Sequence, residues 1–166
     1  MRVKLQAATS ADISELVCFR SAVNQRLTAQ YGNGYWTPGL TEKGILFMMR
    51  TSTVYVARSR DRLIATLTLS TRKPWAIDKK YFRESKRPLY LTGMAVSPDE
   101  QRKGVGRLCI AEARRIAIHW PSDVIRLDAY DAEAGAGEFY RKCGFREVGR
   151  ARFRDVPLIY FQMDLF

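Results

Sequence analysis

The chain has 166 residues, a length that suits one domain with a single hydrophobic core. Apolar residues make up 46% and charged residues 27% of it, as in ordinary soluble globular proteins, and no apolar run approaches the roughly 18–20 residues that span a bilayer. The net charge of +11, from 28 basic and 17 acidic residues, favours polyanionic partners: nucleic acid, a phosphorylated cofactor or an acidic protein surface.

The N-terminus and the cysteines exclude further classes. Residues 1–6 alternate charged and apolar side chains and lack the apolar stretch of a signal peptide, so we expect a cytoplasmic protein. Cys18, Cys109 and Cys143 have no paired spacing and no histidine at ligand spacing, which predicts neither a disulfide framework nor a metal site. The lone His119 lies near a predicted helix C-terminus, where the helix dipole favours a cation; a catalytic histidine is the alternative.

Strand and helix periodicities alternate along the chain, which predicts an α/β or α+β sheet covered by helices in one domain, residues 1–166. Strands are expected at residues 3–7, 53–58, 63–71, 89–96, 124–130, 145–153 and 158–165. Thr9 and Thr41 can cap the first two helices, the third is expected at 104–120 and the fourth at 134–142.

Loops and glycines punctuate this pattern. Residues 31–39 are rich in Gly and Pro and are predicted to form a loop, whereas residues 72–87 form a basic segment. Gly93 predicts a bulge inside its strand, and Gly144 predicts a left-handed cap after the last helix.

A glycine-rich turn before the third helix is the main chemical signal. It consists of Gln101, Arg102, Lys103, Gly104, Val105, Gly106 and Arg107. Backbone N–H groups at such a turn lie at the positive end of a helix dipole, and Gly104 and Gly106 let an anion approach the backbone. With three cationic side chains added, the turn predicts a pyrophosphate cradle; a purely structural helix start is the alternative. The spacing does not fit a Walker loop, and Cys109 stands where the dinucleotide fingerprint needs its third glycine.

Two stretches carry a family resemblance. Residues 96–108 resemble the acetyl-CoA motif of the GNAT superfamily of N-acetyltransferases, Gln/Arg-x-x-Gly-x-Gly/Ala after a strand and at a helix start. Residues 139–145, Phe-Tyr-Arg-Lys-Cys-Gly-Phe, are similar to the family's tyrosine followed by Gly-Phe. The resemblance covers nearly the whole chain in element order. It implies a single-domain GNAT fold, with a mixed central sheet of about seven strands splayed at the fourth and fifth and about four flanking helices.

The resemblance also implies a coenzyme site without a metal. Met94, Ala95 and Val96 correspond to the splayed strand that offers backbone groups to the pantetheine arm of acetyl-CoA, and one of their N–H groups could polarise the thioester carbonyl. Residues 101–107 would wrap the pyrophosphate. Glu133 stands where many members have an Asn that contacts the coenzyme, so it is left out of these contacts.

Catalytic residues follow in part from the same resemblance. Tyr140 matches the tyrosine that protonates the leaving thiolate in many members, and a donor within reach of that sulfur lowers the barrier; a packing role is the alternative. An amine with a pKa near 10 must lose a proton before it attacks. Asp128 precedes the Tyr140 helix, where some ribosomal-protein N-acetyltransferases carry a catalytic Glu, and is the first candidate base. Glu84, Glu133 and a chain of waters are the alternatives.

We therefore predict an N-acetyltransferase that moves acetyl from acetyl-CoA to an amine by direct attack in a ternary complex, since no cysteine lies at a motif position. The acceptor is expected to be a small molecule or peptide, with no membrane partner, and a homodimer is an option because dimers are common in the family. The aromatics of residues 31–36 and 75–82 either line the acceptor cleft or pack their loops onto the core. The alternative function is a basic nucleic-acid- or protein-binding module with a non-catalytic acyl-CoA site. Both coenzyme motifs are intact, which disfavours nucleic acid as the partner.

Overall fold

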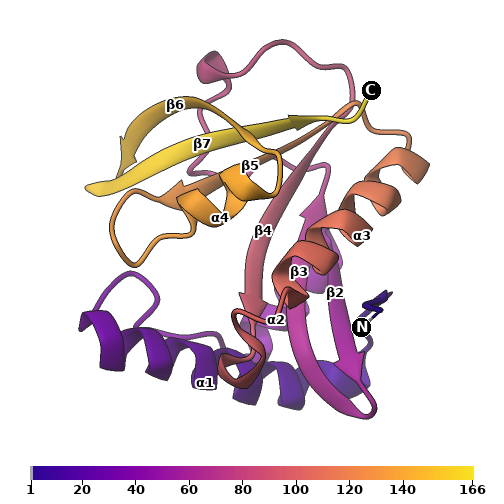
Figure 1. The fold of residues 1–166 in the computed structure, drawn as a ribbon, viewed down its shortest axis with the longest axis vertical. Helices are drawn as coiled ribbons and strands as arrows, with labels where there is room; N and C mark the ends of the chain where they lie inside the picture. Colours follow the sequence, from indigo (N-terminus) through magenta and orange to yellow (C-terminus); the bar gives the residue numbers. More distant parts are fainter. Residues whose placement is uncertain (1) are drawn as a thin grey trace.

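The fold was analysed in a computed structural model that describes residues 2–166. A seven-stranded sheet has the order β1-β2-β3-β4-β5-β7-β6 (Figure 1). Its strands are β1 (Leu5–Ala7), β2 (Thr53–Ser59), β3 (Arg62–Ser70), β4 (Pro88–Val96), β5 (Val124–Tyr130), β6 (Arg146–Phe153) and β7 (Val156–Asp164). The helices are α1 (Ile13–Tyr31), α2 (Glu42–Thr51), α3 (Val105–His119) and α4 (Gly137–Lys142), with short 3-10 helices η1 (Ser10–Asp12), η2 (Lys79–Tyr81) and η3 (Pro98–Glu100). The predicted mixed sheet with four flanking helices is confirmed.

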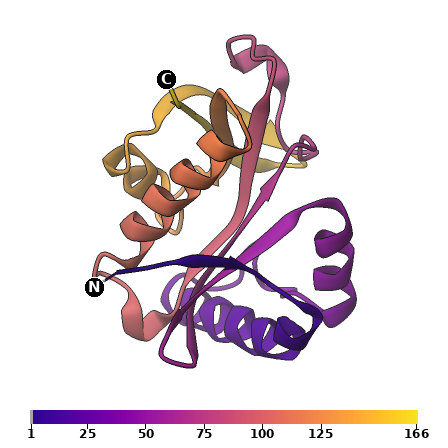
Figure 2. The same ribbon diagram turned by 90° about the vertical axis from the view of Figure 1, so that its right-hand side faces the viewer.

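The sheet separates two helical layers. Figure 2 shows α1 and α2, in indigo and purple, on one face and α3 and α4, in orange, on the other. Strand alternation sends Leu67 and Ile125 toward the α3 layer and Val54 and Val56 toward the α1 layer, and all four side chains are buried. Each such burial contributes about 1.5–3 kcal/mol to folding. Within residues 2–166, no helix combines the length and apolarity needed to cross a bilayer.

The centre of the sheet is where its strands part. β4 and β5 run parallel and pair only from Pro88 to Tyr90, opposite residues 124–126, as the predicted splay requires. The β3–β4 register shifts next to Gly93, which has φ +60°, so the predicted bulge is confirmed. β4 therefore bends away from β5 and leaves one of its edges without a neighbouring strand.

Helix termini follow local chemistry, with one difference from prediction. Thr41 Oγ1 accepts the Gly44 N–H at 3.1 Å, as a capping residue does. The last helix starts at Gly137 rather than at residue 134, because the chain first makes a tight turn in which the Gly135 N–H donates to the Ala132 carbonyl at 2.8 Å. Only glycine fits at position 135, where an added Cβ would lie 1.8 Å from the Tyr130 carbonyl oxygen. Gly144, at φ +92°, ends that helix as predicted.

Candidate active site

Free backbone N–H groups gather where η3 leads into α3. Gly104 is the N-cap at φ +84°, and Arg102 also has a left-handed backbone at φ +63°. A turn of mixed handedness points successive N–H groups to one side, which is the geometry of an anion-binding nest. Among residues 2–166, no oxygen accepts a hydrogen bond from the N–H groups of residues 101–107. A strained non-glycine residue of this kind costs about 1–3 kcal/mol and is typical of ligand clamps.

The side chains of this turn divide into two kinds. Arg102 and Arg107 are exposed and form no ion pair with the part of the chain that the structure describes. Lys103 Nζ lies 3.6 Å from Glu100 Oε2, so its charge is partly compensated. Gln101 Nε2 donates to the Val96 carbonyl at 3.1 Å and ties the turn to β4. The two arginines are therefore the cations most available to an anion.

The open edge of β4 continues directly into this turn. The Ser97 N–H donates to the Ile64 carbonyl on β3 at 2.8 Å, so the backbone groups of Val96 point to the opposite edge, where β5 has departed. Ala95 packs its side chain in the α1 layer, whereas Met94 and Val96 pack against the α3 layer. The Val96 N–H, at the end of β4, and the N–H groups of residues 101–107, just beyond it, thus have no partner among the described residues.

Tyr140 lies in α4 with a buried ring and an unpartnered hydroxyl. Its ring is 6% exposed and packs edge-on against Phe139 and Phe145, with centroids 5.2 and 5.6 Å away. Among the described residues, its hydroxyl neither donates nor accepts a hydrogen bond, and the hydroxyl oxygen is not fully enclosed by protein atoms. Burial, and to a lesser degree the nearby Asp128 charge, raise the pKa of the phenol. Tyr140 therefore stays protonated at neutral pH and can donate a proton.

Asp128 is a half-buried carboxyl group on β5. It lies opposite Tyr160 on β7, and its side chain forms no ion pair within residues 2–166. Burial raises the pKa of Asp128 above its ordinary value. The other candidate bases, Glu84 and Glu133, are exposed side chains in loops. The structure thus brings Asp128 and Tyr140 within electrostatic reach of each other and leaves the alternatives in solvent.

Aromatic side chains border Asp128 from two segments. From the α1–α2 loop, Tyr35 lies 5.2 Å from the ring of Tyr130, two residues beyond Asp128 on the same strand. From the basic segment, Tyr81 lies 5.3 Å from the ring of Tyr160. Trp75, also a candidate for the acceptor cleft, is 86% exposed and lines a shallow pocket together with Tyr81 and Tyr160. The geometry supports a packing role for Tyr81 and leaves Tyr35, which is 62% exposed, able to meet an acceptor.

Arg20 belongs to this site and escaped the sequence-based prediction. Its Nη1 donates to the carbonyl oxygen of Gly93, in the β4 bulge, at 3.0 Å. A signal was present: Arg20 lies four residues after Leu16 and three before Val23, in the apolar stripe of α1. A cation within such a stripe marks either a buried ion pair or a binding site.

The cysteines and the histidine take no part in the site. Burial raises the pKa of Cys109 to about 11 and also raises the pKa of Cys143, so both remain thiols at neutral pH. His119 ends α3, with Nδ1 2.8 Å from the Arg115 carbonyl oxygen, at the opposite end of that helix from the glycine-rich turn.

The sequence is similar to those of known acetyltransferases. The family model described as "Acetyltransferase (GNAT) family" matches residues 21–145. The glucosamine 6-phosphate N-acetyltransferase of Schizosaccharomyces pombe is 29% identical over 102 residues, which cover 59% of this chain and 84% of that protein.

Solved structures share the fold. The ribosomal-protein-S18-alanine N-acetyltransferase of Escherichia coli has a TM-score of 0.72 at 14% identity, covering 98% of this chain and 94% of its own. The PaiA N-acetyltransferase of Thermoplasma acidophilum, in complex with coenzyme A, has a TM-score of 0.71 at 14% identity, covering 96% of this chain and 98% of its own. Since the family model matches more than half of the sequence, the chain belongs to the GNAT family of acetyltransferases.

Proposed function

We propose that this protein transfers the acetyl group of acetyl-CoA to an amine by direct attack in a ternary complex. The observation that carries the proposal is the edge of β4 that β5 leaves uncovered after Tyr90, followed by the turn of residues 101–107, whose N–H groups have no partner among the described residues. An extended pantetheine arm that ends in a pyrophosphate matches an open strand edge that ends in an anion-binding turn. The coenzyme A complex of a protein with this fold supports the same match.

Different groups of the protein then carry out the binding and the proton transfers of the reaction. The N–H groups of residues 101–107 and the side chains of Arg102 and Arg107 hold the pyrophosphate. An N–H of residues 94–96 donates to the thioester carbonyl oxygen and stabilises the negative charge that develops there. Asp128 takes a proton from the ammonium group, directly or through water, and the freed amine attacks the carbonyl carbon. As the C–S bond breaks, Tyr140 gives its proton to the sulfur. The nitrogen then loses its second proton through water to the Tyr140 phenolate, which leaves the amide and the free thiol, and Asp128 releases the first proton to solvent.

The environments of the two side chains suit these roles. A carboxyl group whose pKa lies above its ordinary value is a better base than an exposed one. Tyr140, protonated and with a free hydroxyl, is a hydrogen-bond donor at neutral pH. Cys109 and Cys143 are thiols rather than thiolates, which supports direct transfer over an acetyl-enzyme.

Calorimetry with acetyl-CoA, followed by an amine panel read by free-thiol release, tests the proposal. We expect saturable heat, and an affinity at least about 10-fold weaker when Arg102 and Arg107 are both changed to Gln, because each loses a charge-assisted contact to phosphate. Arg114→Gln, an exposed charge removed further along α3, is the matched control and should bind like the wild type. No heat from folded wild-type protein would overturn the proposal.

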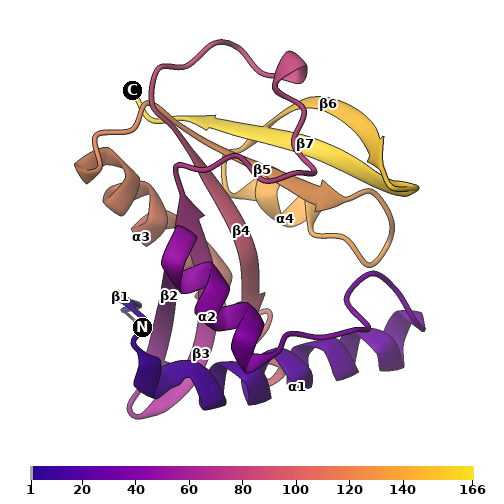
Figure 3. The ribbon, with the colours of Figure 1, turned by 180° about the vertical axis from the view of Figure 1, so that it is seen from behind.

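A basic binding module remains the competing function, on one observation. Five basic residues line a groove of about 850 Å³, against two acidic ones, Glu84 and Asp123; the basic residues are Lys79, Lys80, Arg83, Lys86 and Arg126. Figures 1 and 3 place this segment at the opposite end of the sheet from the start of α3. Salt-sensitive binding of single-stranded nucleic acid, without heat from acetyl-CoA, would favour this module.

A further inference from the structure

A cavity of about 250 Å³ lies between the α1–α2 layer and the sheet. Figure 3 shows α2 crossing in front of β2 and β3, with α1 running below them. The apolar part of its wall comes from five side chains, Leu16, Leu40, Ile45, Met48 and Val54. Four further side chains add hydroxyl groups: Ser52, Thr66, Thr68 and Thr92. The cavity reaches the β4 bulge at Gly93, and its one charged lining residue is Arg20.

The guanidinium of Arg20 is incompletely satisfied. Among residues 2–166, its Nε is the one buried side-chain polar atom that has no hydrogen-bond partner. The only hydrogen bond that its Nη atoms form with a described residue is the one to the Gly93 carbonyl. No carboxylate of the described residues lies within ion-pair distance. Burial lowers the pKa of Arg20, because the surrounding protein atoms displace part of the water that solvates an exposed guanidinium.

Arg126 shows that this chain can satisfy a buried guanidinium by itself. Arg126 is 4% exposed, yet it donates to Gln162 and to the Arg83 carbonyl and lies 4.9 Å above the ring of Phe82. Arg20 has no such set of partners. Arg20 is half-buried, with its Nε enclosed, and a partly desolvated cation without a counter-charge is unfavourable; an anionic ligand in the cavity would offset that cost.

We propose that Arg20 binds a carboxylate of the acceptor, and that the acceptor is a small amine with a carboxylate and an apolar body, the chemistry of an apolar amino acid. This inference rests on the proposed function. A carboxylate accepts two parallel hydrogen bonds from a guanidinium fork, and the free Nε lies on one side of such a fork. A phosphate dianion fits less well, since one arginine in an otherwise neutral wall would leave a negative charge uncompensated.

The position of Arg20 connects this anion site to the chemistry. Its partner Gly93 directly precedes Met94, the first of the residues proposed to face the thioester. A carboxylate on Arg20 therefore lies beside the segment at which the amine must arrive. Thr68, whose hydroxyl lies near Gly93, adds a neutral donor at the same place.

Matched acceptor triplets test the inference. Each triplet contains an apolar amino acid, its carboxamide and the corresponding amine without the carboxyl carbon, for example leucine, leucinamide and isoamylamine. Turnover is measured with saturating acetyl-CoA for the wild type, Arg20→Met, Arg20→Lys and Arg26→Met. Arg26→Met makes the same change at an exposed position of α1. Circular dichroism and acetyl-CoA calorimetry check that each variant is folded and loads the coenzyme.

We expect the wild type to prefer the acid over its carboxamide by about 10- to 100-fold in kcat/KM, mainly through KM, because a charge-assisted contact distinguishes them. Arg20→Met should lose the preference, Arg20→Lys should keep part of it, and Arg26→Met should keep all of it. Retention of the preference by folded Arg20→Met overturns the inference. Turnover of carboxylate-free amines in preference to the acids, or acetyl-CoA binding without acetylation of any acid, also overturns it. In those cases the heat from acetyl-CoA still reports separately on the proposed function.

Discussion

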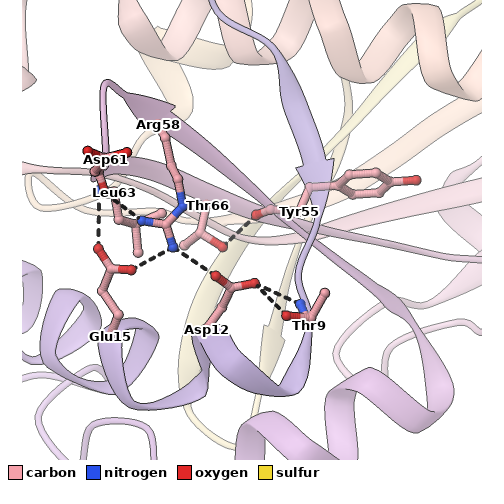
Figure 4. A network of polar contacts seen from close by, with 8 residues as sticks. All are labelled: Thr9, Asp12, Glu15, Tyr55, Arg58, Asp61, Leu63 and Thr66. Carbon is pink, nitrogen blue, oxygen red and sulfur yellow. Dashed lines mark hydrogen bonds and ion pairs between the residues drawn. The ribbon is translucent and has the colours of Figure 1, made fainter.

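Two arginines connect α1 with the sheet, and their surroundings differ. Near the start of α1, Arg58 Nη2 lies 2.8 Å from Asp12 Oδ1 and 2.5 Å from Glu15 Oε2, and its Nη1 donates to the Asp61 carbonyl (Figure 4). One turn or more further along, Arg20 faces a cavity with a single backbone acceptor. Satisfied charges hold the helix to the hairpin, whereas unsatisfied ones gather where β4 and β5 part. We therefore expect substitutions at the satisfied charges to reduce stability, and substitutions at the groups without partners to reduce activity.

Among the groups without partners near the parted strands, Asp128 is expected to affect activity most when it is replaced by Asn. We expect kcat to fall by about 10²–10⁴-fold, as for loss of a general base. The melting temperature at about pH 8 should stay the same or rise. Folding raises the pKa of this carboxyl, so ionisation above that folded pKa disfavours the folded state, and Asn removes that cost.

The measurement combines steady-state kinetics with thermal melts at about pH 5 and about pH 8. Any stability advantage of Asp128→Asn should be larger at the higher pH. An unchanged kcat would remove Asp128 from the mechanism and leave a water chain as the route for the proton.

Tyr140→Phe tests whether an unpartnered hydroxyl acts in catalysis. The ring contacts with Phe139 and Phe145 stay, so we expect little change in stability or in acetyl-CoA affinity. The proton donor to the leaving sulfur is lost, and kcat should fall by about 10- to 100-fold. Tyr55→Phe removes another buried tyrosine's hydroxyl, away from the strands that part, and should leave kcat unchanged. Equal rates for the wild type and Tyr140→Phe would assign the ring a packing role.

The smallest effect is expected for Arg58, whose guanidinium is satisfied by two carboxylates. Arg58→Met should lower the melting temperature by about 2–4 °C, or about 1 kcal/mol, with unchanged kinetics; the value is modest because Glu15 is 42% exposed and screened by water.

The stabilisation that Arg58 contributes depends on pH in a definite direction. The Thr9 backbone N–H and then Arg58 lower the pKa of Asp12, and Arg58 is the main cause that lowers the pKa of Glu15. The stabilisation is present above the ordinary carboxyl pKa values and is lost as pH falls through the lowered ones. Melting curves of the wild type and the variant should therefore converge in acid. A gap that persists below about pH 3 would mean that Arg58 acts through packing instead.

Sequence alone predicted the features that depend on neighbouring residues. The glycine-rich turn, the Gly93 bulge and the Gly144 cap each follow from a backbone conformation that few residues adopt, so their positions are written locally. The start of α4 was missed because residues 131–136 form a tight turn, closed by the Gly135 N–H and the Ala132 carbonyl, whose packing against Tyr130 the local sequence does not show.

The electrostatics of the site could not be read in the same way. Arg20 meets Gly93 across 73 residues of sequence, and only folding shows that no carboxylate accompanies it. Asp128 was the first candidate base only because of its place in the family resemblance, and the sequence did not show its burial between the neighbouring strand β7 and the aromatics around it. Residue types were predictable, whereas the absence of their partners was a property of the fold.

The uncovered edge of β4 has a consequence for the life of the protein in a cell. An unpaired strand edge inside a sheet invites association with other chains, and a ligand lying along it prevents that contact. On the proposed function, coenzyme present at a hundredfold excess over its Kd adds about 2.7 kcal/mol to the stability of the folded state. The protein without coenzyme is then expected to melt at a lower temperature, and to be cleaved faster by an added protease, than the protein with coenzyme bound.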